Sequence, residues 1–347
     1  MTTIARAPGR ISLGGGGTDL PAYYERYGGA VVSLALPTHA YAHVSARASG
    51  LELVSLDHGS REVIPAERFA RRMRYPFLAE EFLTLQKAVA WHFGLDRARF
   101  AASSELPAGG GLGASAAVCV ALVAAAAAYL GENVDRTGMA EIAARIEMSV
   151  LRRPCGKQDQ YTSAFGGLHL YEFSRDGSVA VTPVAVGPDV RRSLEEHLIL
   201  FSNGGRRNAA GPLAELVRRC TTEDAGTLNA LAELKAVAYA VRDALEADDV
   251  SAVGSLLDRG WSAKRRLHSQ VTSPEIDRAY ALAMEAGALG GKLTGAGLAG
   301  SMLFVCPPSR QDDLRRVLGS QGWRSEPVRI EDAGASLYEE DSGALSG

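Results

Sequence analysis

The sequence has little cysteine and no cysteine pattern that organises a site. Its four cysteines lie far apart without a C-x-x-C pair, which excludes a zinc knuckle and a disulfide framework. The sequence also has no large excess of either charge. Its formal net charge of -3 provides no broad basic surface for nucleic acid or anionic lipid. Residues 1–6 contain no apolar core of a secretory signal. We therefore expect a cytoplasmic protein with a small-molecule partner, without nucleic-acid or membrane partners.

What is present is typical of a packed enzyme, with 46% hydrophobic and 22% charged residues. A chain of 347 residues is long enough for two domains, and we place an N-terminal lobe at 1–190 and a C-terminal lobe at 191–347. Residues 112–130 form an uncharged run of 19, the length of a membrane span. Because the run is largely alanine and has no basic anchors, we predict a buried helix instead.

Apolar periodicity predicts an α+β protein with a boundary near residues 187–196. The expected strands are Ile4–Leu13, Ala30–Leu36, Ala40–Ala46, Leu51–Leu56, Arg61–Ile64, Phe100–Glu105, Leu168–Phe173, Val179–Val186, Leu198–Phe201 and Ser301–Cys306. Besides the alanine-rich segment, the expected helices are Leu20–Tyr27, Phe77–Phe93, Met139–Leu151, Leu213–Cys220, Leu228–Ala247, Val250–Asp258, Ser273–Ala286 and Gln311–Leu318. We expect the tail from Glu339 onward to be frayed.

A glycine-rich loop, PAGGGLGAS at 107–115, leads into the alanine-rich helix. Glycine lets backbone N–H groups approach a phosphate closely, and the helix adds the positive end of its dipole. Ser115 falls in the first helical turn, where its hydroxyl can reach a metal ion that bridges ATP phosphates. The alternative is an ordinary tight turn at a helix start, which this loop alone does not exclude.

Two other nucleotide-binding motifs fit this loop poorly. Gly109, Gly111 and Ala114 match the dinucleotide pattern G-x-G-x-x-[GA], but the strand ending in an acid about 20 residues later is missing. No Walker motif is present, because residues 291–294 have an extra residue between the lysine and the threonine. A nicotinamide-dependent oxidoreductase is therefore the weaker enzyme hypothesis.

Two further glycine-rich loops lie near the two ends of the chain. In the first, GGGGTD at 14–19, Asp19 can hydrogen-bond two vicinal hydroxyls of a sugar. Its alternative role is an N-cap of the short helix that follows. The third loop, GAGLAG at 295–300, precedes a strand and can line the other side of a cleft.

Two acidic residues, Glu147 and Asp159, are separated only by a helix end and a turn. Phosphoryl transfer needs one carboxylate for Mg²⁺ and one that accepts the proton of the attacking hydroxyl or orients it. Lys157 lies two residues before Asp159, where it can neutralise charge on the transferring phosphoryl group. An exposed helix acid and a solvated lysine are the alternative interpretations of Glu147 and Lys157.

The three loops together resemble those of the GHMP kinase family. The matching segments are PGRISLGGGGTD at 8–19, LPAGGGLGASAA at 106–117 and KLTGAGLAG at 292–300, which span nearly the whole chain. The resemblance implies an α+β, two-lobed fold with an N-terminal mixed sheet, a smaller ferredoxin-like C-terminal lobe, and the active site between them. Within the family, PCGKQDQYTSAFGG at 154–167 resembles the sugar 1-kinases. It is most similar to the D-glycero-D-manno-heptose 7-phosphate kinases, with L-fucose kinases and galactokinases further off.

The resemblance implies an ATP- and Mg²⁺-dependent carbohydrate kinase, which we expect to be a monomer or homodimer. The catalytic residues would be Asp159, Arg10 and Lys157, and Ser115 and Glu147 would hold Mg²⁺. The ATP contacts would be Pro107, Gly109, Gly110, Gly111, Leu112, Gly113, Ala114 and Ser115, and the sugar contacts Gly16, Gly17, Thr18, Asp19, Arg206 and Gly297. One departure is Ala114 before Ser115, where many members have two hydroxyl residues in succession; one phosphate or metal contact is thereby lost.

The segment SNGGRR at 202–207 resembles an arginine-bearing loop of the heptose kinases. Arg206 or Arg207 would bind a substrate phosphate in a bidentate manner, and a solvated basic turn is the alternative. The predicted reaction transfers the ATP γ-phosphate to the anomeric hydroxyl of a heptose 7-phosphate, giving the 1,7-bisphosphate. A kinase of unphosphorylated L-fucose or galactose and a non-catalytic ATP- and sugar-binding sensor are the alternatives.

Overall fold

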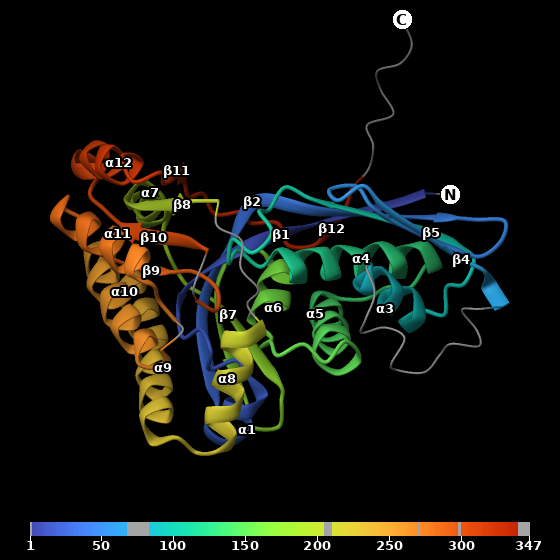
Figure 1. Ribbon diagram of the computed structural model, residues 1–347, viewed down its shortest axis with the longest axis horizontal. Coiled ribbons are helices and arrows are strands. Elements are labelled where there is room, and N and C mark those ends of the chain that lie inside the picture. Colours follow the sequence, from blue (N-terminus) through green and yellow to red (C-terminus); the bar gives the residue numbers. More distant parts are fainter. Residues whose placement is uncertain (1, 68–82, 205–209, 270, 298–299, 339–347) are drawn as a thin grey trace, which may run out of the picture.

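The chain builds two β-sheets, shown in the computed structural model of Figure 1. This structure describes residues 2–67, 83–204, 210–269, 271–297 and 300–338. One sheet has eight strands in the order β12-β1-β2-β5-β3-β4, with β6 paired to β2 and β7 paired to β6, and the other has the order β11-β8-β10-β9. The strands are β1 Thr2–Gly14, β2 Gly29–Ala46, β3 Leu51–Ser55, β4 Ser60–Ile64, β5 Ala98–Ser104, β6 Leu168–Phe173, β7 Val179–Pro183, β8 Leu198–Ser202, β9 Gly290–Leu293, β10 Ser301–Val305, β11 Arg324–Pro327 and β12 Ser336–Leu337.

Helices cover these sheets. In the described part of the chain they are α1 Pro21–Tyr27, α3 Thr84–His92, α4 Ala114–Leu130, α5 Arg136–Arg145, the π-helix η2 Ile146–Val150, α6 Gln158–Phe165, α7 Pro188–His197, α8 Ala210–Thr221, α9 Ala225–Glu246, α10 Val250–Arg265, α11 Pro274–Glu285, the 3-10 helix η3 Pro308–Arg310 and α12 Gln311–Gly319. The first part of the helix expected at Phe77–Phe93, and the tail from Glu339, lie outside the described residues.

The larger sheet branches at β2. The two strands expected at Ala30–Leu36 and Ala40–Ala46 are one strand, because Pro37 and Thr38 are accommodated by a register shift against β1. The first half of β2 pairs with β6 and the second half pairs with β5. Among the described residues of this sheet, only β3 and β5 pair in parallel, so the sheet is mixed, as expected.

The alanine-rich segment forms the buried helix α4, as the sequence predicts. Eleven of its residues are buried between β1 and β2 on one side and α3, α5 and α6 on the other, as Figure 1 shows. Alanine suits this position because its small side chain allows the sheet and three helices to approach closely. No helix among the described residues is long and apolar enough to span a membrane.

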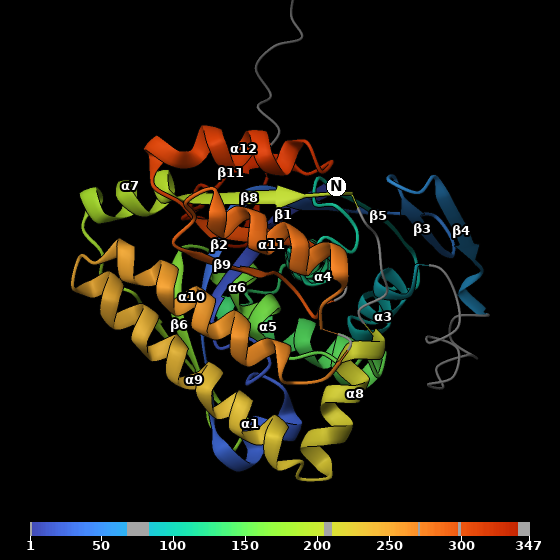
Figure 2. The ribbon, with the colours of Figure 1, turned by 60° about the vertical axis from the view of Figure 1, so that its left-hand side comes forward.

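The smaller sheet is antiparallel throughout and packs against helices from the second half of the chain. Figure 2 shows α9 and α10 side by side beneath it. Strands β9, β11 and β12 and helices α6 and α7 were not predicted, and α7 lies where a domain boundary was expected. Val237 and Val241 of α9 share one hydrophobic core with Ile11 and Val32 of the larger sheet, so the two sheets are joined by packing. The boundary at residue 190 stays a prediction.

Candidate active site

The phosphate loop, defined here as residues 107–115, lines a cavity of about 390 Å³ between the two sheets. Gly109, Gly111 and Gly113 have φ values of 76°, 74° and 78°, which disfavour any residue with a side chain. Gly113 is the N-cap residue of α4. No side chain caps this helix, so no capping side chain accepts a hydrogen bond from its first N–H groups. These features fit an anion site at the helix N-terminus, as the sequence suggests.

The third loop holds the phosphate loop from the side of the smaller sheet. The Ser301 N–H donates to the Gly110 carbonyl at 3.0 Å, and the Thr294 hydroxyl lies within hydrogen-bond distance of the Ser301 and Gly110 carbonyls, at 2.9 Å and 3.2 Å. A Cβ on Gly111 would lie 2.7 Å from the Thr294 hydroxyl. The two loops therefore fit together only with glycine at this position. Gly297 lines the cavity as predicted for a substrate contact, with φ 119°.

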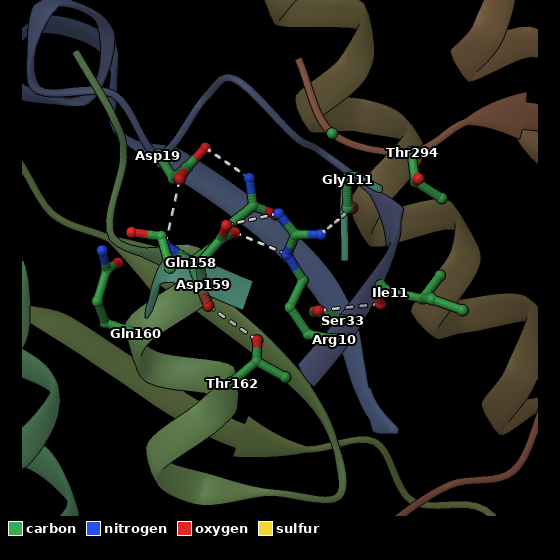
Figure 3. A network of polar contacts seen from close by, with 12 residues as sticks. Arg10, Ile11, Asp19, Ser33, Gly111, Gln158, Asp159, Gln160, Thr162 and Thr294 are labelled. Atoms are coloured by element: carbon green, nitrogen blue, oxygen red, sulfur yellow. Dashed lines mark hydrogen bonds and ion pairs between the residues drawn. The ribbon is translucent and has the colours of Figure 1, made fainter. Parts of the chain in front are cut away.

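Arg10 and Asp159, which both line the cavity, form a bidentate ion pair (Figure 3). Arg10 Nε and Nη2 donate to the two carboxylate oxygens of Asp159 at 2.7 Å and 2.5 Å. Nη1 donates to the Gly111 carbonyl at 2.5 Å. Arg10 belongs to β1 and its side chain is only 6% exposed. One buried guanidinium thus fixes the carboxylate relative to the phosphate loop.

Ser115 and Glu147 come together as predicted for a metal site. The Ser115 hydroxyl donates to Glu147 Oε1 at 2.6 Å, and the Glu147 side chain is 4% exposed. Glu147 lies in the π-helix that follows α5, and such turns often occur at functional sites. Arg153 was not predicted to take part, but its Nη1 donates to Ser115 Oγ at 2.7 Å and to Glu147 Oε1 at 3.0 Å.

The first turn of α6 connects all three carboxylates. Gln158 donates to Asp19 through its backbone N–H and its Nε2, both at 3.1 Å, as Figure 3 shows. Gln160 donates to Glu147 Oε2 at 2.7 Å, and Asp159 between them pairs with Arg10. Sequence reasoning missed both glutamines, although an acid flanked by two amides in a helical turn was a usable signal.

Asp19 is the carboxylate held without an arginine. Its oxygens accept hydrogen bonds from Gly17 N–H and from Gln158, and α1 begins at Pro21 without a side-chain cap, so Asp19 does not cap α1. Burial, followed by the nearby charge of Asp159, raises the pKa of the Asp19 carboxyl. Asp19 is 2% exposed and lines the cavity, where its position fits the predicted contact with sugar hydroxyls.

One predicted sugar contact of the first loop, Thr18, needs a correction, whereas Gly16 and Gly17 stay predictions. Thr18 is fully buried, and its hydroxyl donates within the protein, to the carbonyls of Gly15 and Ala30 at 2.8 Å and 3.0 Å. A Cβ on Gly15 would lie 1.8 Å from the Ala30 carbonyl oxygen. Neither Thr18 nor the predicted contacts Gly16 and Gly17 lie among the residues that line the cavity. This loop therefore places Asp19 and packs against β2.

Lys157 is also misassigned as a catalytic cation. Its ammonium donates to both oxygens of Glu141, at 2.7 Å and 3.0 Å, and to the Gly177 carbonyl at 2.8 Å. These partners occupy its three donors, and Lys157 does not line the cavity. It anchors the start of α6. The predicted phosphate-binding residues Arg206 and Arg207 lie outside the described residues.

Two buried lysines approach the cavity from the smaller sheet. Lys292 lines the cavity and donates to the Ser12 carbonyl at 2.8 Å. Burial, with a smaller effect of Arg10, lowers its pKa to about 7. Lys264 donates to the carbonyls of Leu293 and Gly295 and so holds the third loop. Neither role was predicted, because the burial of a single lysine cannot be inferred from the sequence.

A second cavity of about 630 Å³ lies on the other side of the phosphate loop. Its walls combine Leu85 and Val118 with polar groups of His58 and Ser104. It shares residues of the phosphate loop with the first cavity, so the two cavities adjoin there. The shared residues are Pro107, Gly109, Ala114 and Ser115.

Comparison with known proteins assigns this arrangement. The family model for the GHMP kinases N terminal domain matches residues 79–167, and the model for the GHMP kinases C terminal domain matches residues 241–324. The chain belongs to the GHMP kinase family. The matched segments contain the phosphate loop, Glu147, Asp159 and Lys292.

Several GHMP kinases that act on sugars are similar over most of this chain. A D-glycero-alpha-D-manno-heptose 7-phosphate kinase from Campylobacter jejuni is 28% identical, covering 92% of this chain and 94% of its own. The crystal structure of a D-glycero-D-manno-heptose 1-phosphate kinase from Bacteroides thetaiotaomicron aligns with a TM-score of 0.77 and 25% identity, over 99% of this chain and 100% of that one. A galactokinase from Mycobacterium bovis is 28% identical over 65% of this chain and 70% of its own.

The expected two-lobed fold and enzyme class are thereby confirmed. This GHMP kinase is an ATP-dependent carbohydrate kinase. The roles of individual residues stay predictions.

Proposed function

We propose that this GHMP kinase transfers the γ-phosphate of ATP to the anomeric hydroxyl of D-glycero-D-manno-heptose 7-phosphate, giving the 1,7-bisphosphate. The observation that carries phosphoryl transfer is the convergence of Asp19, Asp159 and Glu147 on the phosphate loop through one turn of α6. The heptose phosphate as substrate is favoured by the similarity to two heptose-phosphate kinases that this chain matches over more than nine tenths of its length.

The acceptor sugar binds in the first cavity, with two vicinal hydroxyls on the carboxylate of Asp19. Its anomeric hydroxyl donates to a remaining lone pair of Asp159, which orients it toward the γ-phosphate. Arg10 holds Asp159 in place by two hydrogen bonds. Backbone N–H groups of the phosphate loop and the ammonium of Lys292 stabilise the negative charge of the transferring phosphoryl group.

The donor set of Ser115 and Glu147 fits a magnesium ion. Hydroxyl and carboxylate oxygens are the ligands that Mg²⁺ prefers, and few protein ligands suffice because water and ATP phosphates supply the rest. When bound, Mg²⁺ neutralises charge on the phosphates of ATP. The second cavity, on the outer side of the phosphate loop, takes the nucleoside.

The decisive experiment is ADP release measured with a panel of acceptors: heptose 7-phosphate, heptose 1-phosphate, L-fucose and galactose. Heptose 1-phosphate belongs in the panel because the names of the two similar heptose kinases differ in the position of the phosphate. We expect kcat/KM for heptose 7-phosphate to exceed that for both hexoses by at least about 100-fold, because a site built for a phosphate rejects acceptors that lack it. Activity confined to unphosphorylated hexoses would contradict the substrate assignment.

Asp159→Asn separates an enzyme from a sensor that only binds ATP and sugar. We expect kcat to fall about 1000-fold, within the usual range for loss of a general base, while ATP still binds. Phosphorus NMR of the wild-type product identifies the phosphorylated carbon. Full turnover by Asp159→Asn would refute the role of Asp159 and leave the acceptor panel as an independent test.

A further inference from the structure

An arginine occupies the position predicted for the magnesium ion. Nη1 of Arg153 lies 2.7 Å from Ser115 Oγ and 3.0 Å from Glu147 Oε1. Nη2 donates to the Thr84 hydroxyl at 3.2 Å. The two oxygens that fit a divalent cation are thus already bound to a cation that belongs to the chain.

This contact is incompatible with simultaneous binding of a metal ion by the same oxygens. The Ser115 hydroxyl donates its proton to Glu147 and accepts a hydrogen bond from Arg153. Glu147 Oε1 accepts from both Ser115 and Arg153, while Oε2 accepts from Gln160. A metal ion that took Ser115 Oγ and Glu147 Oε1 as ligands would have to displace the guanidinium.

Arg153 is also held in a way that permits its departure. Its backbone is fixed, because its N–H donates to the Glu147 carbonyl at 2.9 Å and its carbonyl accepts from Cys155 N–H. Its side chain, however, is 37% exposed and lies on the wall of the second cavity. The guanidinium can therefore turn into that cavity without movement of the main chain.

A resident cation has a clear physical purpose here. The Glu147 side chain is 4% exposed, and a buried carboxylate without a partner is strongly unfavourable. Before ATP and its metal bind, Arg153 neutralises this charge and keeps Ser115, at the start of α4, in place. A guanidinium that turned into the second cavity would still lie beside residues of the phosphate loop, in the cavity proposed for the nucleoside.

We propose that Arg153 is an exchangeable counter-cation, which holds the Ser115–Glu147 pair in the nucleotide-free enzyme and yields this position to Mg²⁺ when MgATP binds. The inference rests on the proposed function in taking Ser115 and Glu147 as the metal ligands. It adds that metal binding is a competition with a residue of the chain, so the free enzyme has low affinity for the metal alone.

Mn²⁺ titration of the nucleotide-free enzyme, followed by the electron paramagnetic resonance of free Mn²⁺, tests this competition without any turnover. We expect Arg153→Met to bind Mn²⁺ at least about tenfold more tightly than wild type, because the competing cation is gone. Arg192→Met removes an exposed arginine of α7 and should bind Mn²⁺ as wild type does. Equal Mn²⁺ affinity in wild type and Arg153→Met would overturn the proposal.

Thermal unfolding gives a second readout. We expect Arg153→Met to melt at a lower temperature than wild type without metal and to regain stability with Mg²⁺, whereas wild type responds little to Mg²⁺ alone. Arg153→Gln keeps a hydrogen-bond donor for Glu147, so it protects the fold if Arg153→Met does not fold, and should show tighter Mn²⁺ binding as well. If neither variant gains affinity for the metal, the exchange does not occur. If the metal results hold but no sugar is phosphorylated, only the proposed function fails.

Discussion

The active site contains two arginine–carboxylate pairs that are alike in chemistry and different in construction. Arg10 comes from a central strand, has a side chain only 6% exposed and donates through all three nitrogens, two of them to Asp159. Arg153 comes from the connection before α6, is 37% exposed and contacts Glu147 with one nitrogen, which it shares with Ser115. The first pair is a permanent part of the site, and the second can be exchanged.

The difference shows how one site treats carboxylates with different tasks. Asp159 must stay in one orientation relative to the phosphate loop, and a bidentate guanidinium supplies that orientation. Glu147 must accept a metal ion, so its partner is bound less firmly. Asp19, the third carboxylate, is held by amide groups alone, and its raised pKa is the consequence of burial without a paired cation.

Replacing each arginine with lysine tests the contrast, and the largest effect should come from Arg10. We expect Arg10→Lys to lower kcat about 100-fold, because hydrogen bonds between charged groups contribute about 1.5–3 kcal/mol and lysine cannot form the bidentate pair. Arg153→Lys should stay within about threefold of wild type, because a single charged contact suffices there. Steady-state kinetics with saturating MgATP measures both.

The unfolding temperature of each lysine variant shows whether a loss of activity comes from unfolding. If Arg10→Lys and Arg153→Lys lose the same activity, the distinction between a permanent and an exchangeable pair is wrong.

Gly156→Ala should have the next largest effect, because it disturbs the carboxylate that has no arginine. A Cβ at residue 156 would lie 1.9 Å from Asp19 Oδ2, so the Asp19 carboxylate would have to move. Overpacking of this kind costs about 1–3 kcal/mol, so we expect kcat/KM for the acceptor sugar to fall about 10- to 100-fold. The KM for ATP should change less than about twofold, since phosphate-loop geometry is untouched.

Gly319→Ala is the matched control, because a Cβ at residue 319 meets nothing within 4 Å. An acceptor KM in Gly156→Ala that equals the wild-type value would show that Asp19 does not position the sugar.

The contrast between the pairs also marks what the sequence can and cannot reveal. The roles of the phosphate loop, Asp159 and the Ser115–Glu147 pair were predicted because glycine spacing and acid type are local signals and because the three loops together resemble those of the GHMP kinases. Lys157 was misassigned because its sequence distance from Asp159 does not reveal that its ammonium points to Glu141. Arg153 was missed because an arginine before a proline is typical of a surface turn. Pairing across the site depends on the folded chain.

The prediction of helices and strands likewise succeeded where the signal was local. The alanine-rich helix was predicted from its long uncharged run, and most strands were predicted from their apolar alternation. The short strands β9 and β11 were missed, since each consists of only four residues and is defined by pairing with its neighbours. Helix α7 was interpreted as a boundary because its sequence, PDVRRSLEEH, is mostly polar. In the structure, Leu194 is the one buried residue of this helix.

The two glutamines beside Asp159 allow a finer test of the two acids that they hold. Gln160→Leu removes the donor to Glu147 Oε2 and should raise the Mg²⁺ concentration for half-maximal activity about tenfold. Gln158→Leu should raise only the acceptor KM, by about fivefold, because the backbone N–H of residue 158 still donates to Asp19. Kinetics at varied Mg²⁺ and varied sugar separates the effects, and identical responses would show that α6 acts only as a rigid support.

The smallest effect is expected from the ionisation of Lys292. Lys292 can lose its proton near neutral pH, whereas Arg10 cannot. The Lys292 ammonium has its pKa lowered to about 7, first by burial and then by Arg10, so it is charged below that pH and neutral above it. A bound phosphate is stabilised by the charged form, so ATP binds somewhat more weakly above pH 7, where Lys292 is mostly neutral. We therefore expect the KM for ATP in wild type to rise about threefold from pH 7 to pH 9.

Lys292→Arg should remove this rise, because arginine stays charged over the whole range. Stability should respond with the opposite sign: the unfolded chain keeps the Lys292 proton up to about pH 10.4, so the destabilisation from burying this lysine decreases as pH rises above 7. Unfolding of Lys292→Met and wild type at pH 7 and pH 9 measures that contribution as a difference. A KM for ATP that rises equally in wild type and Lys292→Arg would assign the pH dependence to another group and leave Arg10 as the cation that acts on the phosphoryl group.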